Sequence, residues 1–562
     1  MQKITLLLAP VAVALLASCS GKMGALSADN FTVNPNPLEA QAGQVPATIN
    51  GMFPEKYMNK KAVVKVIPEL RYQTASGQQT AQGTAATFQG EKVLGNDQTI
   101  SYLMGGRYTM KTNFQYVPDM QQSDLYLTFD ARIGNKKVSV PDVKIGTGVI
   151  ATSELCYNTI TTAMPSAARD AFQRISAQKQ EANVKFLIGQ AQLRKSELQN
   201  NSVQEFVRLI NDIAKDQQGK MIEAIEVSAY ASPDGGYALN EKLAGKRQDV
   251  TTDYVQQLLK KANAESSIDA KYTAEDWEGF QQLVAASNIQ DKDVILRVLS
   301  MYKDPEEREQ QIKNISAGFR ELADGILPQL RRARMIINYQ IIGRDDAQIL
   351  KQIQDDPSKL SVEELLYGAS LYKNDPEKAE AAYRKAAELF PNDARAFNNV
   401  GIMQMAKGNT QEAQKWLEKA RQLNGSLPEA NANLGLLALQ KGNVQEAENL
   451  IAKAANAQGI SEILGNLHLA QGKYTQAEND FSEVFSNSAA LAFIMNKNYA
   501  QAAVTLKHID NPDATTDYLK AIVAARTGNM TEAAQMLQAA IAKDPKYAEY
   551  AAKDLELSKV NK

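Results

Sequence analysis

The sequence predicts a multidomain protein with an N-terminal all-β sandwich-like domain, a central α/β domain and a C-terminal all-α solenoid. Its 562 residues exceed what a single hydrophobic core usually serves, so several domains are expected. Short alternating runs of β-branched and aromatic residues, separated by turn residues, fill the stretch 46–156. Strand-like and helix-like stretches alternate over 183–345. Beyond residue 350 a helical pattern recurs, first at intervals of 34 residues and then at shorter intervals of 30, 25 and 31.

The composition argues against several classes of function. The chain carries 62 basic and 64 acidic residues, so it has no overall field that would attract nucleic acid. Two histidines and two cysteines leave little material for a metal site or a histidine-based catalytic triad. We also find no nucleotide-binding loop and no hydrolase or metalloprotease motif. We therefore expect no cofactor, no metal and no enzymatic activity.

The N-terminus has the features of a signal peptide. Lys3 precedes an apolar run, Ile4 to Leu16, which is too short to span a bilayer. The sequence Leu16-Ala17-Ser18-Cys19 that follows resembles the lipobox of bacterial lipoproteins. The resemblance implies a signal peptide over 1–18 and fatty acyl chains, such as palmitate, on Cys19. Two or more chains hold a protein stably at a membrane. Alternatively, Cys19 is an ordinary small residue at the end of a signal peptide.

The residues after Cys19 suggest the compartment. Ser20 follows it, and in Gram-negative lipoproteins the lack of Asp at this position implies sorting to the outer membrane. No acidic run follows, so we expect the protein to face the periplasm. Residues 19–45 are small and polar and predict a flexible spacer.

The β-rich stretch 46–156 contains no motif with recognisable chemistry. A partner-binding module and a spacer domain fit it equally well. Cys156 has no partner within the chain once Cys19 is acylated, so it predicts a buried structural thiol. A helix over 157–182 is expected to connect this domain to the next.

The central domain is organised around a strand, a turn and a helix. From Ile225 to Ala231, apolar and more polar residues alternate with the period of a half-buried strand. The turn residues Pro233 to Gly236 follow. Asn240 then precedes a helical pattern, on which Arg247 falls close to the apolar face and near the turn.

This stretch resembles the central motif of the OmpA-like peptidoglycan-binding domain. The family pattern reads G-[HY]-T-D, a short loop, then N-x-x-L-[SA]-x-x-R. Its counterparts here are Ala229, Tyr230, Ala231 and Ser232, then Asn240, Leu243, Ala244 and Arg247. The resemblance implies that the Asp and Arg positions hold the diaminopimelate of a peptidoglycan stem peptide. Here Ser232 occupies the Asp position, and the nearest acid is Asp234.

The resemblance extends over the whole central domain. A strand beginning at Asn183 opens it, and Met335 to Ile342 supplies the closing strand after Leu330-Arg331-Arg332-Ala333. About fifty residues of helical character, 274–327, interrupt the family pattern before that strand.

The C-terminal region, 350–562, resembles a tetratricopeptide repeat solenoid of about six repeats. Small residues recur where paired helices cross, at Ala379, Ala413, Ala447, Ala477, Ala502 and Ala533. A glycine for the turn between helices precedes four of them by five residues. A capping helix is expected near Ala548 to Leu557. The resemblance implies a groove for peptides or protein segments. Asn399, Asn433 and Asn466 fall on first helices, where they either face this groove and recognise a partner or are simply a common residue type at that position.

Two functions remain open from the sequence. In the first, an outer-membrane lipoprotein tethers the membrane to peptidoglycan through Arg247, Asp234, Ser232 and Asn240, and scaffolds protein partners on its repeats. In the second, the OmpA-like domain no longer binds peptidoglycan because Ser232 has replaced the acid, and the protein is an adaptor in an assembly or secretion complex.

Overall fold

The computed structural model describes residues 23–289, 291–314 and 320–560, so Cys19 lies outside the described residues. The chain forms two compact units. Unit 1 combines the residues up to Arg169 with those from Lys373 onward, and unit 2 comprises Asp170–Tyr372. Unit 2 is therefore inserted in sequence between the two halves of unit 1. Among the described residues, we find no helix with the length and apolar character needed to cross a bilayer.

The N-terminal half of unit 1 is β-rich and contains two main open sheets. The three-stranded sheet has the order β1-β3-β8, and the larger one has the order β10-β9-β4-β6-β7, with β5 and β11 pairing with β4 and β9. Both sheets contribute to one apolar cluster, in which Ile49 and Phe53 lie with Val64 and Leu127. The strands are β1 (Phe31–Asn34), β2 (Leu38–Glu39), β3 (Gln44–Phe53), β4 (Ala62–Thr74), β5 (Gly77–Gln82), β6 (Ala86–Gly90), β7 (Gln98–Ile100), β8 (Gly106–Gln115), β9 (Ser123–Ile133), β10 (Lys136–Ser139), β11 (Val143–Thr147) and β12 (Val149–Ile150).

The flexible spacer predicted over 19–45 is wrong for its described part. Met23 and Leu26 are buried in the cluster of the β-rich region, and Phe31–Asn34 pairs with β3. A few apolar residues among polar neighbours are sufficient to fix this stretch to the domain, and composition alone does not identify them.

The connecting helix predicted over 157–182 is also wrong. Helix α1 (Cys156–Thr159) and a 3-10 turn (Ile160–Thr162) end at Ala163, and β13 (Ile175–Lys185) already begins the next sheet. The residues between them have no helical hydrogen bonds. Side chains of the solenoid bind their backbone instead, as described below.

Unit 2 contains a four-stranded sheet of order β13-β16-β14-β15. Strand β16 is antiparallel to both of its neighbours, and β14 is parallel to β15. Phe206 and Ile210 of α3 pack with Val255 and Leu259 of α4 in one cluster with the strands, so both helices cover the sheet. The elements are β13, α2 (Lys195–Leu198), α3 (Asn201–Lys215), β14 (Lys220–Tyr230), α4 (Tyr237–Ala262), β15 (Ile268–Thr273) and β16 (Arg332–Ile342). The opening strand begins eight residues earlier than the sequence predicts.

Helices fill the stretch between β15 and β16. They have their own apolar core, which includes Phe280, Val284, Ile295 and Leu330. The described helices here are α5 (Trp277–Ala286), α6 (Lys292–Met301), α7 (Pro305–Asn314), a π-helical turn (Leu322–Ile326) and α9 (Leu327–Leu330). Two further helices, α10 (Asp346–Asp355) and α11 (Val362–Leu371), complete unit 2.

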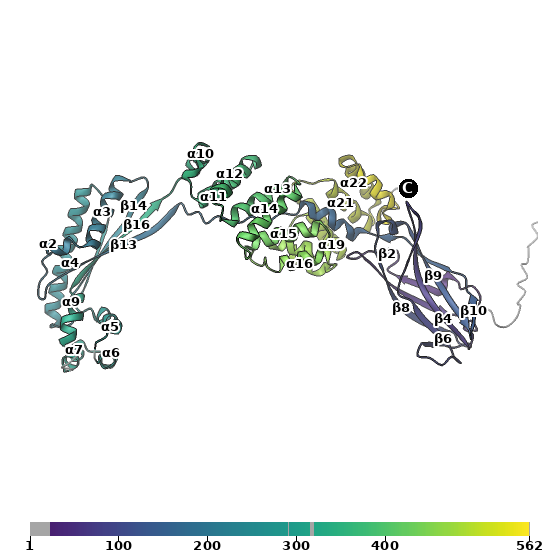
Figure 1. Cartoon of the computed structure of the whole chain (residues 1–562), viewed down its shortest axis with the longest axis horizontal. Coiled ribbons are helices and arrows are strands. Elements are labelled where there is room, and N and C mark those ends of the chain that lie inside the picture. Colours follow the sequence, from purple (N-terminus) through teal and green to yellow (C-terminus); the bar gives the residue numbers. More distant parts are fainter. Residues whose placement is uncertain (1–22, 290, 315–319, 561–562) are drawn as a thin grey trace, which may run out of the picture. The chain divides into compact units, whose positions relative to one another are not determined.

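The C-terminal half of unit 1 is a solenoid of antiparallel helices in which successive helices pack together (Figure 1). Small residues such as Ala413 and Ala447 are fully buried at the crossings, as the repeat pattern predicts. Gly408 and Gly442 adopt φ of 74° and 76° in the turns between helices, where other residues would be strained. The helices are α12 (Pro376–Leu389), α13 (Ala394–Ala406), α14 (Thr410–Leu423), α15 (Pro428–Gln440), α16 (Val444–Ile451), α17 (Ile460–Ala470), α18 (Tyr474–Asp480), α19 (Asn487–Met495), α20 (Tyr499–Lys507), α21 (Ala514–Arg526), α22 (Met530–Lys543) and α23 (Lys546–Lys553).

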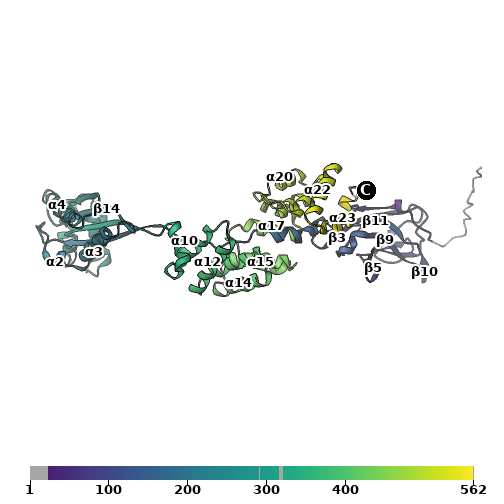
Figure 2. The ribbon, with the colours of Figure 1, turned by 90° about the horizontal axis from the view of Figure 1, so that it is seen from above.

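The two halves of unit 1 contact each other extensively. The stretch before residue 170 lies among the solenoid helices in both views (Figure 1 and Figure 2). Leu155 and Cys156 belong to the same apolar cluster as Phe481 and Tyr518 of the solenoid. Thr152 Oγ1 also donates a hydrogen bond to Glu556, near the end of the chain, over 2.8 Å.

Candidate functional site

The strand, loop and helix predicted around residues 225–255 form one corner of unit 2. Strand β14 ends at Tyr230 and α4 begins at Tyr237, so the loop is six residues long. The buried amide of Asn240 donates to the carbonyls of Ser232 at 3.2 Å and of Gly235 at 2.7 Å. Asn240 thus ties the loop to the first turn of α4.

Arg247 is the largest fully buried side chain of the described residues, with 0% of its surface exposed. Its Nε donates to the carbonyl of Gln190 at 3.0 Å, one Nη to that of Tyr230 at 2.9 Å, and the other to that of Leu187 at 3.2 Å. Burial lowers the pKa of Arg247 to about 10; the nearby charge of Arg331 also lowers it, and that of Asp234 raises it. The guanidinium therefore joins the loop after β13 to the end of β14.

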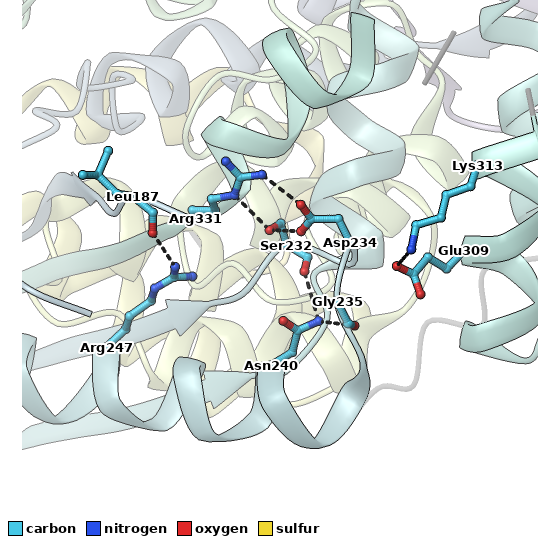
Figure 3. A network of polar contacts seen from close by, with 9 residues as sticks. All are labelled: Leu187, Ser232, Asp234, Gly235, Asn240, Arg247, Glu309, Lys313 and Arg331. Atoms are coloured by element: carbon cyan, nitrogen blue, oxygen red, sulfur yellow. Dashed lines mark hydrogen bonds and ion pairs between the residues drawn. The ribbon is translucent and has the colours of Figure 1, made fainter. Parts of the chain in front are cut away.

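Asp234 pairs with Arg331 rather than with Arg247 (Figure 3). Arg331 lies just before β16, and its Nη donates to Asp234 Oδ2 at 2.9 Å. The Ser232 hydroxyl donates to the other oxygen of Asp234 and accepts from Arg331 Nε at 3.2 Å. Within the described chain, no hydrogen bond links Asp234 to Arg247. Ser232, Asp234 and Arg331 therefore form a closed polar cluster, which we call the corner triad.

The helical insertion covers the corner triad. Its beginning is fixed to the sheet, since the main-chain N–H of Asp276 donates to the carbonyl of Ala231 and the Asp276 carboxylate pairs with Arg332 at 2.9 Å. Trp277 and Phe280 line the small cavity beside Asp234. That cavity has a volume of about 10 Å³, which is enough for roughly one water molecule.

The corner triad has the right chemistry for a zwitterion but little free capacity. A carboxylate and a guanidinium could bind an ammonium and a carboxylate of a ligand, as the family resemblance implies. Here the two groups are bonded to each other, and only 17% of the Asp234 side chain and 10% of that of Arg331 is exposed. A ligand would have to break this pair and displace the insertion.

The asparagines predicted to face the solenoid groove are all buried, with exposures of 1% for Asn399, 0% for Asn433 and 2% for Asn466. The first two bind the chain's own main chain. Asn399 accepts from the N–H of Ala168 and donates to its carbonyl, both at 2.9 Å. Asn433 forms the same pair of bonds with Ser166, both at 2.7 Å. Asn466 instead donates to the carbonyl of Glu462 in its own helix.

The groove is therefore occupied by a stretch that we call the groove segment, Ala163–Arg169. The sequence did not identify this segment as a ligand, nor did it identify Asn398, whose amide donates to the Ser166 carbonyl at 3.1 Å. It also missed Arg331 as the partner of Asp234, although the pair Arg331-Arg332 was visible before the closing strand. All three omissions concern pairs separated by about 100 residues or more in the sequence.

The remaining candidates, Cys156, His468 and His508, each have a structural explanation. Burial raises the pKa of the Cys156 thiol, which is 8% exposed, in agreement with a structural role. His468 Nδ1 lies 2.5 Å from Asp480, and His508 Nδ1 lies 2.8 Å from the carbonyl of Val504. Over the described ranges, no group of three or more His, Cys, Asp or Glu side chains is arranged to hold a metal ion.

Comparisons with known proteins identify the solenoid. The tetratricopeptide repeat family matches residues 369–428, 404–461 and 503–548. Solved structures that match include a tetratricopeptide repeat protein from Parabacteroides merdae (16% identity, 37% of this chain and 91% of the other, TM-score 0.28). PilF of Pseudomonas aeruginosa (18%, 34% and 97%, 0.28) and yeast Tom70 (14%, 58% and 76%, 0.24) also match. No curated protein matches the chain. The C-terminal region consists of tetratricopeptide repeats, a fold that serves protein–protein interaction.

Proposed function

We propose that this protein is a non-enzymatic outer-membrane lipoprotein that acts as an adaptor in an assembly or secretion complex. Cys19 carries the lipid anchor, the protein faces the periplasm, and the tetratricopeptide repeats contact a protein partner. The OmpA-like domain has a structural role here and does not bind peptidoglycan. This is the second of the two functions that the sequence leaves open.

One observation favours the adaptor over the tether: Arg247 is buried and donates to three main-chain carbonyls. A guanidinium that grips a ligand carboxylate by paired hydrogen bonds needs two of its donors free. Releasing them would leave carbonyls of Leu187, Gln190 or Tyr230 without a partner, at a cost of about 1–3 kcal/mol each. Arg247 therefore fits a role in holding the fold together.

Peptidoglycan tethering remains a second candidate because the corner triad places a carboxylate and a guanidinium together at the corner expected from the family. In that case Arg331 would replace Arg247 as the group that binds the ligand carboxylate, and Asp234 would bind the ammonium. The insertion would have to move to admit the ligand.

Sedimentation with purified sacculi separates the two candidates. The adaptor function predicts that the full chain stays in the supernatant. A tether predicts that it sediments, and that Asp234→Asn and Arg331→Met each abolish sedimentation. The matched control is Lys313→Ala, which removes a cation from α7 that forms an exposed ion pair with Glu309 (Figure 3). Sedimentation that depends on Arg331 but not on Lys313 would overturn the adaptor function.

The anchor and the partner need separate tests. Metabolic labelling with a palmitate analogue should mark the wild-type chain and not the Cys19→Ala variant, and the variant should leave the membrane fraction. Reversible cross-linking in cells should recover one protein in a constant ratio to the full chain. Deleting the repeats is a poor control, because residues 152–169 pack against them. Recovery of no protein in constant ratio would contradict the adaptor function.

A further inference from the structure

The groove segment is bound to the solenoid in the manner of a peptide ligand. The backbone becomes extended at Ala163, and side chains of the solenoid bind the main chain of every second residue from Met164 to Ala168. The N–H of Met164 donates to the Glu462 carboxylate, Ser166 is bound by Asn433, and Ala168 is bound by Asn399. Asn399 and Asn433 lie on successive repeats, so one repeat of the solenoid corresponds to two residues of the segment.

These contacts bind the main chain of the segment and limit the size of the side chains at Ser166 and Ala168. Ser166 and Ala168 are 2% and 5% exposed, because the asparagine amides bring the backbone close to the helices. The Ser166 hydroxyl donates to the carbonyl of Gln458 at 2.7 Å. By contrast, 70% of Met164 is exposed. The groove therefore requires small residues at the positions of Ser166 and Ala168 and admits a larger side chain at the position of Met164.

The floor of the groove is polar where the segment lies. Asn398 donates to both the Ser166 carbonyl and the Asn399 side chain at 3.1 Å, and Asn433 donates to Asn398 at 3.0 Å. The hydrogen-bond donors and acceptors of such linked amides can be paired either by water or by a peptide main chain. An apolar floor would have indicated a permanent core. Ile160, which precedes the segment, and Ala163, its first residue, instead belong to an apolar cluster with α15 and α17.

We propose that the groove is a peptide-binding site closed by the chain's own segment Ala163–Arg169, and that its partner is an extended peptide with small residues at the two positions that Ser166 and Ala168 occupy. The partner displaces the segment and takes over its bonds to Asn399 and Asn433. This inference rests on the scaffold role of the repeats proposed above. It adds the site, the kind of partner and the autoinhibitory state.

The test measures binding of a labelled peptide to the purified full chain. The probe is a fluorescein-labelled peptide with the sequence of residues 160–170, ITTAMPSAARD. The variant Ser166→Arg/Ala168→Arg should open the groove, because bulky cations do not fit where those two side chains are buried. By fluorescence anisotropy, the opened variant should bind the peptide in saturable fashion and at least tenfold more tightly than the wild type does.

Matched controls test the contacts. Adding Asn399→Ala and Asn433→Ala to the opened variant should weaken binding at least tenfold, whereas adding Asn443→Ala, an exposed asparagine in the turn after α15, should not. A peptide with Met164→Ala should bind as well as the parent peptide, and one with Ser166→Arg should not bind. Equal affinity of wild type and opened variant, or no binding by an opened variant with a native circular dichroism spectrum, would overturn the proposal.

Hydrogen exchange of the wild-type chain covers the case in which the opened variant does not fold. If the segment is a ligand, the amides of Ser166 and Ala168 exchange by local release, faster than the slowest amides of α15. Exchange of those two amides only with global unfolding would show that the segment is a permanent part of the core and would overturn the proposal. These experiments use purified protein without membranes or cells, so their failure is distinguishable from failure of the adaptor function.

Discussion

Replacing Arg247 by Ala should destabilise unit 2. The substitution removes three hydrogen bonds from a charged donor, each of which contributes about 1.5–3 kcal/mol, and leaves three carbonyls without that partner. Part of this loss is offset, because the variant no longer has to bury a charged group, which costs several kcal/mol. We expect a net decrease of about 3 kcal/mol in the free energy of unfolding, several times the effect of a typical surface substitution.

The two tryptophans of the chain permit a selective assay. Trp277 lies in unit 2 and Trp416 in unit 1. In a Trp416→Phe background, tryptophan fluorescence during urea unfolding therefore reports unit 2. The transition midpoint should shift to lower urea concentration with little change in slope, since the substitution changes stability and not the surface exposed on unfolding.

Lys246→Ala is the control for this measurement. Lys246 precedes Arg247 on α4, carries the same charge and is exposed. Its removal should change the free energy of unfolding by no more than about 0.5 kcal/mol. If Arg247→Ala also costs less than about 1 kcal/mol, Arg247 does not hold the corner together, and the argument against ligand binding by Arg247 fails.

Three further outcomes are expected. Burial raises the pKa of Asp554 to about 6, so its contribution to stability is complete below about pH 4 and is lost as the pH rises through 6. Relative to wild type, Asp554→Asn should therefore gain about 1.4 kcal/mol between roughly pH 5 and pH 7.5 in urea unfolding, and equal pH slopes would contradict this. Gly435→Ala should destabilise by about 1–3 kcal/mol, because its Cβ would lie 2.5 Å from Ile451, whereas Gly245→Ala meets open space and should stabilise by up to about 1 kcal/mol. A thermal melt that ranks these two glycine variants in the opposite order would refute the packing argument. Cys156 should resist iodoacetamide at about pH 8 in the native chain and react after unfolding, as measured by mass spectrometry; rapid native labelling would show that the thiol is accessible.

The sequence predicted those parts of the fold whose signals are local or periodic. The repeats of the solenoid were recognised because Ala379, Ala413 and Ala447 recur at an interval of 34 residues, which indicates where the helices cross. The strand, loop and helix from Ile225 to Val255 were placed correctly because alternation, turn residues and helical spacing are each visible within a few residues. The assignment of this domain to the OmpA-like family stays a prediction.

The pairing within the corner could not be predicted from the sequence. Asp234 lies two residues after the family's Asp position, and the sequence leaves open whether it lies beside Arg247. In the structure Asp234 pairs with Arg331, which is 97 residues away. Arg331 reaches the corner because β16 lies beside β14 in the sheet, a neighbour relation that no short sequence window contains. The strand order therefore decides that Asp234 pairs with Arg331 and not with Arg247.

The groove asparagines show why equivalent repeat positions differ in role. Asn399 and Asn433 are 34 residues apart and bind an extended main chain, whose N–H and carbonyl groups are free at every second residue. Asn466 occupies the corresponding position in the next repeat, opposite Met164, but there the Glu462 carboxylate accepts from the main-chain N–H of Met164. Asn466 instead donates to the main-chain carbonyl of Glu462, one turn away in its own helix. Equivalent asparagines in successive repeats therefore need not bind the segment in the same way, because a carboxylate one turn away can take over the main-chain N–H.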